Sequence, residues 1–223
     1  MPLPNLPALL LLISILLSAA PHPASAIPTC RPDQSLAQLA SLLPASNGCS
    51  KPPGMMVAGE EDFTYCCDRH DVCYQTCGIG KEFCENEFGS CMANLCEKTF
   101  PASQGCKQAA QMYTMGVMIF GGQGFMESQD GFCECVEKEE LVEHYKGILE
   151  GVYKEHAVGK TEEEIESTLS KALGEKSLDQ LRKTFYRVLK KYDTAIRHVD
   201  DRVGKNPPRP PAKKKKPAPK KEL

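Results

Sequence analysis

The sequence lacks the features that mark nucleotide-binding and nucleic-acid-binding proteins. It contains no Gly-rich phosphate loop, no internal repeat and no basic patch studded with aromatic residues. Neither phosphate-loop chemistry nor nucleic-acid binding is therefore indicated. Beyond the N-terminal segment, no apolar stretch approaches the roughly 20 residues that a membrane-spanning helix needs.

Basic residues are absent ahead of the N-terminal apolar run, which extends for 13 residues from Ala8 to Ala20, interrupted only by Ser14 and Ser18. The small residues Ala24-Ser25-Ala26 follow it, as at a signal-peptide cleavage site. The run is too short to cross a bilayer as a helix. We predict a signal peptide over residues 1–26; the alternative is a buried N-terminal helix.

The chain also lacks the paired C-x2-C motifs of zinc sites. Its 12 cysteines all follow residue 26, and ten of them lie between Cys49 and Cys133. An even number of cysteines behind a secretory signal indicates a disulfide framework, because thiols oxidise in that compartment. We therefore predict a cysteine-rich domain over residues 27–136, with zinc binding as the weaker alternative.

Charge is unevenly distributed along the rest of the chain. The whole sequence carries −2, but the Pro- and Lys-rich residues 204–223 carry +7, which leaves −9 for residues 27–203. We expect this tail to be extended and unfolded. Its lysines either attract anionic lipid headgroups or are simply solvated.

Residues 137–203 contain no cysteine and show helical periodicity. Thr161 with Glu164, and Ser177 with Gln180, match the capping box at a helix start. A heptad seam then predicts either packing against the segment's own helices or a homodimer through residues 177–199. The periodic positions are Leu141, Tyr145, Ile148 and Val152, and the seam is Leu178, Leu181, Phe185, Val188, Tyr192, Ala195 and Val199.

The cysteine spacing predicts a cross-linked pair of helices. Cys66 and Cys73 are seven residues apart, as are Cys84 and Cys91, and seven residues make two helical turns, roughly 10.5 Å of rise. Antiparallel helices would bring Cys73 to Cys84 and Cys66 to Cys91 together. Gly78 and Gly80 lie in the predicted turn between them.

His70 lies between these two predicted bridges. An imidazole is the usual general base near neutral pH, and Asp71 points about 100° further round the helix as an available hard oxygen ligand. Glu85, on the facing helix, is positioned to accept the proton of the far ring nitrogen of His70. The spacing alone leaves open the alternative that His70 and Asp71 are ordinary polar surface residues.

The segment Cys66 to Tyr74 resembles the C-C-x-x-H-D-x-C-Y signature of secreted phospholipases A2 at every fixed position. The continuation Cys77-Gly78, with the cysteines up to Cys133-Glu134-Cys135, is similar to the group XII branch of that family. The resemblance covers about residues 47–141. It implies an all-α, disulfide-rich fold: two antiparallel helices cross-linked by disulfides, with a calcium loop. The C-terminal helical extension over residues 137–203 is added to this fold by its own periodicity.

The resemblance also implies a function, the calcium-dependent hydrolysis of the sn-2 ester of glycerophospholipids at a membrane surface. His70 would activate the attacking water, Tyr74 would support the catalytic network, and Asp71 would bind Ca2+. A Cys49–Cys67 bridge is implied as well. The loop carbonyls implied as further ligands belong to Gly48, Ser50 and Pro52.

The sequence departs from the family at three points, one of which is that residues 137–203 and the tail lie outside the recognisable family core. The second catalytic acid of the family is an Asp, but Glu85 occupies its position, and a displacement of a catalytic group can cost about a hundredfold in rate. The loop over residues 48–54, which includes Pro52-Pro53, has fewer glycines than is usual in the family, which restricts how its carbonyls are presented. These differences motivate the alternative of a weakly active or inactive protein that binds lipid or a partner.

Two further segments bear on lipid and location. The apolar run Met112 to Phe120 is expected to form a core helix; the alternative is the lining of an acyl channel. The terminus Lys220 to Leu223 differs at one position from the K-D-E-L retention signal. We therefore expect a protein of the secretory pathway, either secreted or retained in the endoplasmic reticulum.

Overall fold

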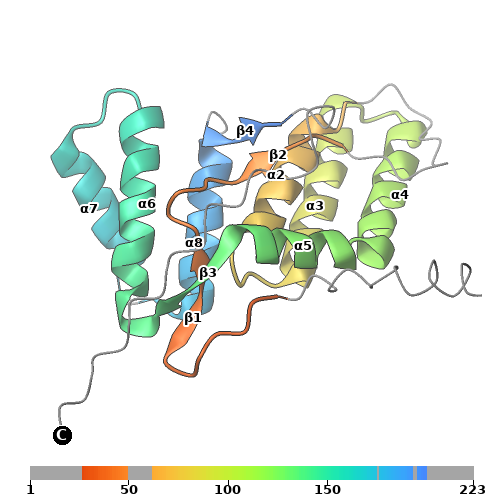
Figure 1. Ribbon diagram of the computed structural model, residues 1–223. Coiled ribbons are helices and arrows are strands. Elements are labelled where there is room, and N and C mark those ends of the chain that lie inside the picture. Colours follow the sequence, from red (N-terminus) through yellow and green to blue (C-terminus); the bar gives the residue numbers. More distant parts are fainter. Residues whose placement is uncertain (1–26, 50–61, 175, 193–194, 200–223) are drawn as a thin grey trace, which may run out of the picture.

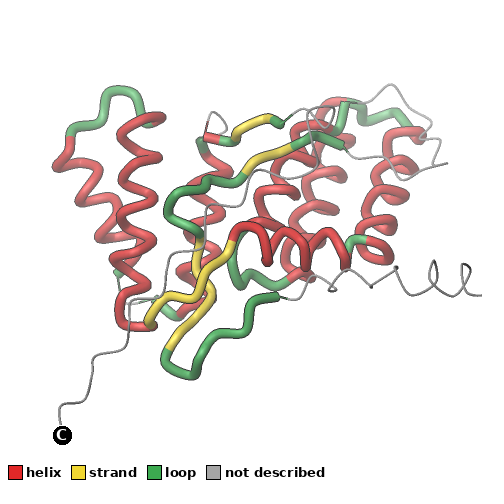
Figure 2. Tube along the Cα trace, viewed as in Figure 1, coloured by secondary structure: helices red, strands yellow, loops and turns green. Residues whose placement is uncertain are grey.

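The computed structural model describes residues 27–49, 62–174, 176–192 and 195–199. Helices dominate this part of the chain, and the strands form two short two-stranded sheets (Figure 2). The all-α, disulfide-rich fold class is thereby confirmed. The helices are α2 (Thr64–Gln75), α3 (Lys81–Thr99), α4 (Gln104–Phe120), α5 (Gly122–Phe132), α6 (Leu141–His156), α7 (Glu162–Leu173) and α8 (Leu178–Lys191).

The helices α2, α3 and α4 stand side by side at one end of the molecule, and α6 and α7 form the other end (Figure 1). Between them, α8 packs against both α2 and α6. The chain turns from α2 into α3 through Gly78, whose φ of 68° is a left-handed conformation that glycine adopts at little cost. The predicted turn at this position is confirmed.

Two small sheets tie distant segments together. Strand β1 (Gln34–Gln38) pairs antiparallel with β3 (Cys133–Glu137), and β2 (Ala45–Ser46) pairs in parallel with β4 (Arg197–His198). A short 3-10 helix, Lys138–Glu140, leads from β3 into α6. The boundary predicted at residue 136 therefore falls at the end of a paired strand.

The extension begins its helices where the sequence predicts. Thr161 and Ser177 both form complete capping boxes, with Glu164 and Gln180 as their reciprocal partners. The apolar faces of α6, α7 and α8 enter one hydrophobic core with residues of α2, including Val72 and Cys73. Arg182 of α8 also donates to Ser35 Oγ at 2.9 Å, so the extension is bonded to the β1 segment.

The heptad seam is shorter than expected. Helix α8 ends at Lys191, where the amide of Tyr192 donates to the carbonyls of Leu189 and Val188 and the chain leaves the helix. The seam residues Leu181, Phe185 and Val188 are buried within this chain. The packing alternative therefore accounts for these residues, and the homodimer stays a prediction.

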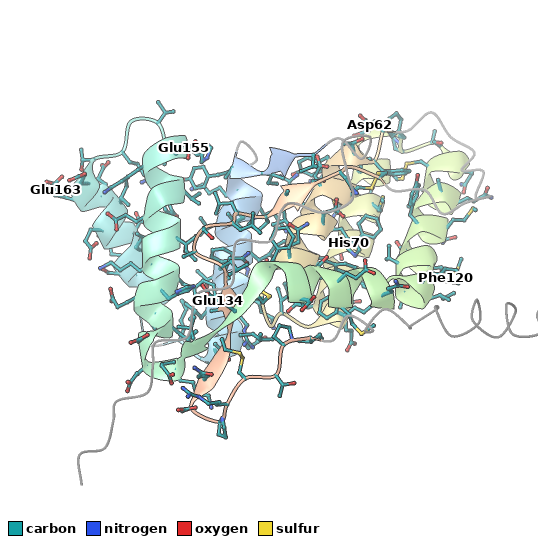
Figure 3. All side chains as sticks on the ribbon, viewed as in Figure 1. Asp62, His70, Phe120, Glu134, Glu155 and Glu163 are labelled. Atoms are coloured by element: carbon teal, nitrogen blue, oxygen red, sulfur yellow. A yellow bond between two sulfur atoms is a disulfide. The ribbon has the colours of Figure 1, made fainter. Side chains whose placement is uncertain are left out.

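The expectation of a core helix over Met112 to Phe120 is wrong for most of that run. Only Tyr113 of its large apolar side chains is buried, packing edge-on against Phe63 with ring centroids 5.7 Å apart. The exposed side chains instead belong to α4 as the helix at the edge of the molecule (Figure 1), with Phe120 near the end of this helix (Figure 3). The exposed side chains here, which we call the α4 apolar patch, are Met112, Met115, Met118, Ile119, Phe120 and Met126 of the adjoining α5.

Candidate active site

The predicted disulfide frame is present. Cys66 pairs with Cys91 and Cys73 with Cys84, at Cα–Cα distances of 5.7 and 5.5 Å that are usual for a disulfide. These two bridges join α2 to α3 in the antiparallel sense. The implied Cys49–Cys67 bridge is also formed. The pairs that the sequence left open are Cys30–Cys135, Cys77–Cys133 and Cys96–Cys106.

His70 projects from α2 into the space between the two helices (Figure 3) and is only 7% exposed. Its ring lies between two aromatic rings, with centroids 4.1 Å from Tyr74 and 4.5 Å from Phe88. Its Nε2 is buried and has no hydrogen-bond partner among the residues that the structure describes. Burial, together with the positive charge of Lys81, lowers the pKa of His70 to about 4.

Glu85 is buried, but its carboxylate is bonded differently from the sequence prediction. Oε1 accepts the hydroxyl of Tyr74 at 2.7 Å and also forms an ion pair with Lys81. Within the described chain no hydrogen bond joins His70 to Glu85. The predicted contact is absent, and the carboxylate is bonded to Lys81 and Tyr74 instead.

Lys81, which the sequence did not single out, is the residue that pairs with Glu85. Its ammonium also donates to the carbonyls of Val117 and Met118 at 3.2 and 3.4 Å, and so it links α3 to the end of α4. The i, i+4 spacing of Lys81 and Glu85 on a predicted helix was a signal that could have revealed the pair.

Burial raises the pKa of Tyr74, and its bond to Glu85 adds to that effect, so Tyr74 stays a hydrogen-bond donor.

Asp71 lies on the face of α2 next to β2 and the residues that follow it. Its Oδ2 accepts from Ser46 Oγ at 2.9 Å and from the Asn47 amide at 3.2 Å. Ser46 Oγ also lies 2.5 Å from Asp68 Oδ1. Two carboxylates therefore share one hydroxyl, which has a single proton to donate.

The other expected metal ligands are only partly described. Gly48 has a φ of 76°, and its amide donates to Ser46 Oγ at 3.0 Å, so the chain turns sharply beside Asp71. Ser50 and Pro52 lie outside the described residues. In the described ranges no three His, Cys, Asp or Glu side chains gather as a metal site. The predicted calcium ligands are the carboxylate of Asp71 and several backbone carbonyls, so they would not form a cluster of three such side chains.

A cavity of about 430 Å³ reaches His70 from the side of the extension. Its walls come from α2, α3 and α8, and α8 contributes Tyr186 and Lys190. The ammonium of Lys190 lies 2.6 Å from Glu87 on α3. The sequence did not predict this cavity, because nothing local in the sequence reveals which face of α8 meets α2.

A helix pair cross-linked by two disulfides, with a His-Asp pair between the bridges and a tight turn beside the Asp, defines a phospholipase A2-like protein. Residues 27–142 match the model of one family, described as group XII secretory phospholipase A2 precursor. The chain belongs to this family. No solved structure matches it.

Curated relatives agree with this assignment. Group XIIA secretory phospholipase A2 of Homo sapiens is 33% identical over 101 residues, and that of Mus musculus is 34% identical over the same length. The group XIIB secretory phospholipase A2-like protein of Mus musculus is 35% identical over 106 residues. Each alignment covers 42% of this chain and 53 or 54% of the relative, so the match spans about half the length of these relatives.

No helix in the described part of the chain is both long and apolar enough to cross a membrane.

Proposed function

We propose that this protein is a calcium-dependent phospholipase A2 that hydrolyses the sn-2 ester of glycerophospholipids to a fatty acid and a lysophospholipid. The observation that carries the proposal is the placement of His70 and Asp71. His70 is fixed between the Cys66–Cys91 and Cys73–Cys84 bridges, and the next residue, Asp71, faces a sharp turn of the chain. A buried imidazole with a strongly lowered pKa, held in a rigid frame, is a feature that clusters at functional sites.

His70 is suited to the role of general base. Its ring is held between the rings of Tyr74 and Phe88, so its orientation is set before substrate binds. In its neutral form the ring accepts a proton from water, and that water attacks the ester carbonyl. The proton then passes to the leaving alkoxide of the lysophospholipid.

Asp71 and the turn at Gly48 suit a calcium ion. Asp68 and Asp71 both approach Ser46 Oγ, so two carboxylate groups lie close together and a cation beside them is electrostatically favoured. Carboxylate and backbone carbonyl oxygens are the ligands that calcium prefers. Asp71 would hold the ion with the carbonyls of Gly48, Ser50 and Pro52, and the bound ion supplies Lewis-acid polarisation of the ester carbonyl.

Tyr74 and Glu85 act in this proposal as positioning residues. The Tyr74 hydroxyl is anchored on Glu85 at 2.7 Å, and the Tyr74 ring packs on His70. Lys81 neutralises the same carboxylate. Glu85 therefore orients His70 through the Tyr74 ring rather than by a direct hydrogen bond.

The α4 apolar patch supports a phospholipid surface as partner. Ile119 and Phe120 are 69% and 71% exposed, and no charged residue occurs between Lys107 and Glu127. An exposed apolar helix end of this kind suits insertion at the level of lipid headgroups. Secretion, retention through Lys220 to Leu223 and a homodimer through residues 177–199 remain separate predictions.

A second candidate function is a lipid-binding protein with little or no turnover. The pairing of Lys81 with Glu85 favours it, since a neutralised carboxylate gives less support to a protonated His70 during the reaction. One relative, the group XIIB protein, is itself named phospholipase A2-like.

Fatty-acid release from mixed phosphatidylcholine and phosphatidylglycerol vesicles separates the two candidates. We expect the oxidised mature protein to release fatty acid with calcium and to stop when a chelator is added. Vesicle binding without release, at any calcium concentration, would support the lipid-binding candidate and refute the enzymatic one.

A further inference from the structure

The cavity between α2, α3 and α8 has the shape of a ligand site rather than of a packing defect. Its volume of about 430 Å³ is within the range of small-molecule sites, roughly 300–1,000 Å³. One of its walls, formed by Tyr186 and Lys190, comes from the extension, which lies outside the residues that match the family. The cavity is therefore formed in part by this chain's own C-terminal helix α8.

The base of the cavity is apolar and closed. Cys66 is fully buried, Phe88 is 3% exposed, and the His70 ring completes this floor. Leu95 continues the apolar wall two turns further along α3. A hydrocarbon chain is the ligand group that such a floor and wall stabilise.

The rim carries positive charge. Lys98 on α3 and Lys190 on α8 line the cavity, and so does Arg69, whose guanidinium carbon lies 3.3 Å from the centroid of the Tyr65 ring. The opposing charge among the lining residues is that of Glu87, which pairs with Lys190. Lys98 has no ion-pair partner among the described residues.

This local excess of positive charge is unusual for the molecule, because residues 27–203 carry a net charge of −9. An anion is thereby favoured at the rim over any cationic ligand. The basic residues 204–223 of the chain itself are unsuited as a ligand for this rim, because like charges repel.

We propose that this cavity binds a single-chain anionic amphiphile of the fatty-acid class, with its carboxylate at Lys98, at the end of the cavity away from the Lys190–Glu87 pair, and its hydrocarbon chain along Leu95 towards Phe88. The inference goes beyond ester hydrolysis and does not depend on it, because binding requires neither calcium nor turnover. A ligand here lies against the wall of the cavity that His70 forms, so the extension presents the ligand to the catalytic helix pair.

The test is calorimetric binding of decanoate to the mature protein in the presence of a chelator. Decanol supplies the same chain without the charge, and acetate supplies the charge without the chain. We expect decanoate to bind, decanol to bind about tenfold more weakly, and acetate not to bind. Absence of decanoate binding up to about 1 mM, or equal affinity for decanol, would overturn the proposal.

Variants locate the site. Lys98→Met should lower decanoate affinity about three- to tenfold, because it removes the charge that faces the carboxylate at a partly exposed rim. Lys183→Met is the matched control: Lys183 lies on α8, pairs with Asp179 at 2.7 Å and lies over an aromatic ring, but it does not line the cavity. Equal losses in Lys98→Met and Lys183→Met would refute the assignment.

A further variant tests whether decanoate binds elsewhere on the protein. Phe120→Ser in the α4 apolar patch should leave decanoate affinity unchanged, and a loss there would move the site to that patch and overturn the proposal. Because Lys98 is exposed, its substitution leaves the fold intact. The chelator removes hydrolysis from the assay, so failure of this proposal is distinguishable from failure of the proposed enzyme.

Discussion

Lys81 forms an ion pair with Glu85 at the same carboxylate oxygen, Oε1, that accepts the hydroxyl of Tyr74. The ammonium also donates to two carbonyls near the end of α4. One side chain therefore connects the buried carboxylate of the candidate active site to the helix that carries the exposed apolar patch.

Replacing Lys81 with Met should destabilise the protein by about 2 kcal/mol, because it leaves the buried Glu85 carboxylate without its counter-ion. Urea unfolding measures this change. Lys183→Met provides the matched control, since its partner Asp179 is 62% exposed, and we expect a loss of at most about 0.5 kcal/mol there. Equal losses in the two variants would show that the Lys81 pair is not a buried one in solution.

Asp71→Asn should weaken calcium binding roughly 10- to 100-fold without unfolding the protein, because it removes the carboxylate charge beside the turn at Gly48. Isothermal titration calorimetry with calcium gives the affinity, and circular dichroism checks the fold. Asp179→Asn, at the exposed start of α8, is the control and should bind calcium as the unmodified protein does. Unchanged calcium affinity in Asp71→Asn would exclude this residue as a ligand.

Acid should destabilise the calcium-free protein through His70. Its folded pKa of about 4 lies below the usual value of 6.5, so the unfolded chain binds more protons between these two pH values. The stability contributed by neutral His70 is complete above pH 6.5 and is lost as the pH falls towards 4, by about 3 kcal/mol in all.

Urea unfolding across this pH range, with a chelator present, measures the loss. His70→Gln should flatten the profile in this window, because glutamine does not titrate. An identical profile in that variant would mean that other groups govern the acid sensitivity.

Ile119→Ser and Phe120→Ser should each weaken binding to zwitterionic vesicles about tenfold, since each removes an apolar side chain that would insert into lipid. Sedimentation at high salt measures this binding while screening the basic tail. Val158→Ser is the control, because Val158 is 99% exposed but lies in the loop after α6. Equal effects of Val158→Ser and Phe120→Ser would argue against the α4 apolar patch as a lipid-binding surface.

The sequence predicted the parts of the structure that depend on local spacing. The seven-residue intervals of Cys66, Cys73, Cys84 and Cys91 determined two bridges, because a helix converts sequence separation directly into rise. The capping boxes at Thr161 and Ser177 were equally local.

What the sequence did not predict depends on contacts between distant segments. The direction of the Glu85 carboxylate is decided by Lys81 and Tyr74 together, and the side-chain rotamers of such residues are not encoded by spacing. The exposure of Phe120 follows from the place of α4 at the edge of the molecule, which an apolar run alone does not reveal. The cavity beside His70 exists because α8 packs on α2. These helices are far apart in the sequence: Arg69 of α2 donates to the carbonyl of Lys190 of α8, which is 121 residues away.

The most direct test of the central claim is fatty-acid release from phospholipid vesicles by the unmodified protein and by His70→Gln, both with calcium. The account predicts release by the unmodified protein and a loss of at least about a hundredfold in the variant, with the thermal unfolding of the variant unimpaired at neutral pH. Equal release by the two proteins would contradict the assignment of His70 as the general base.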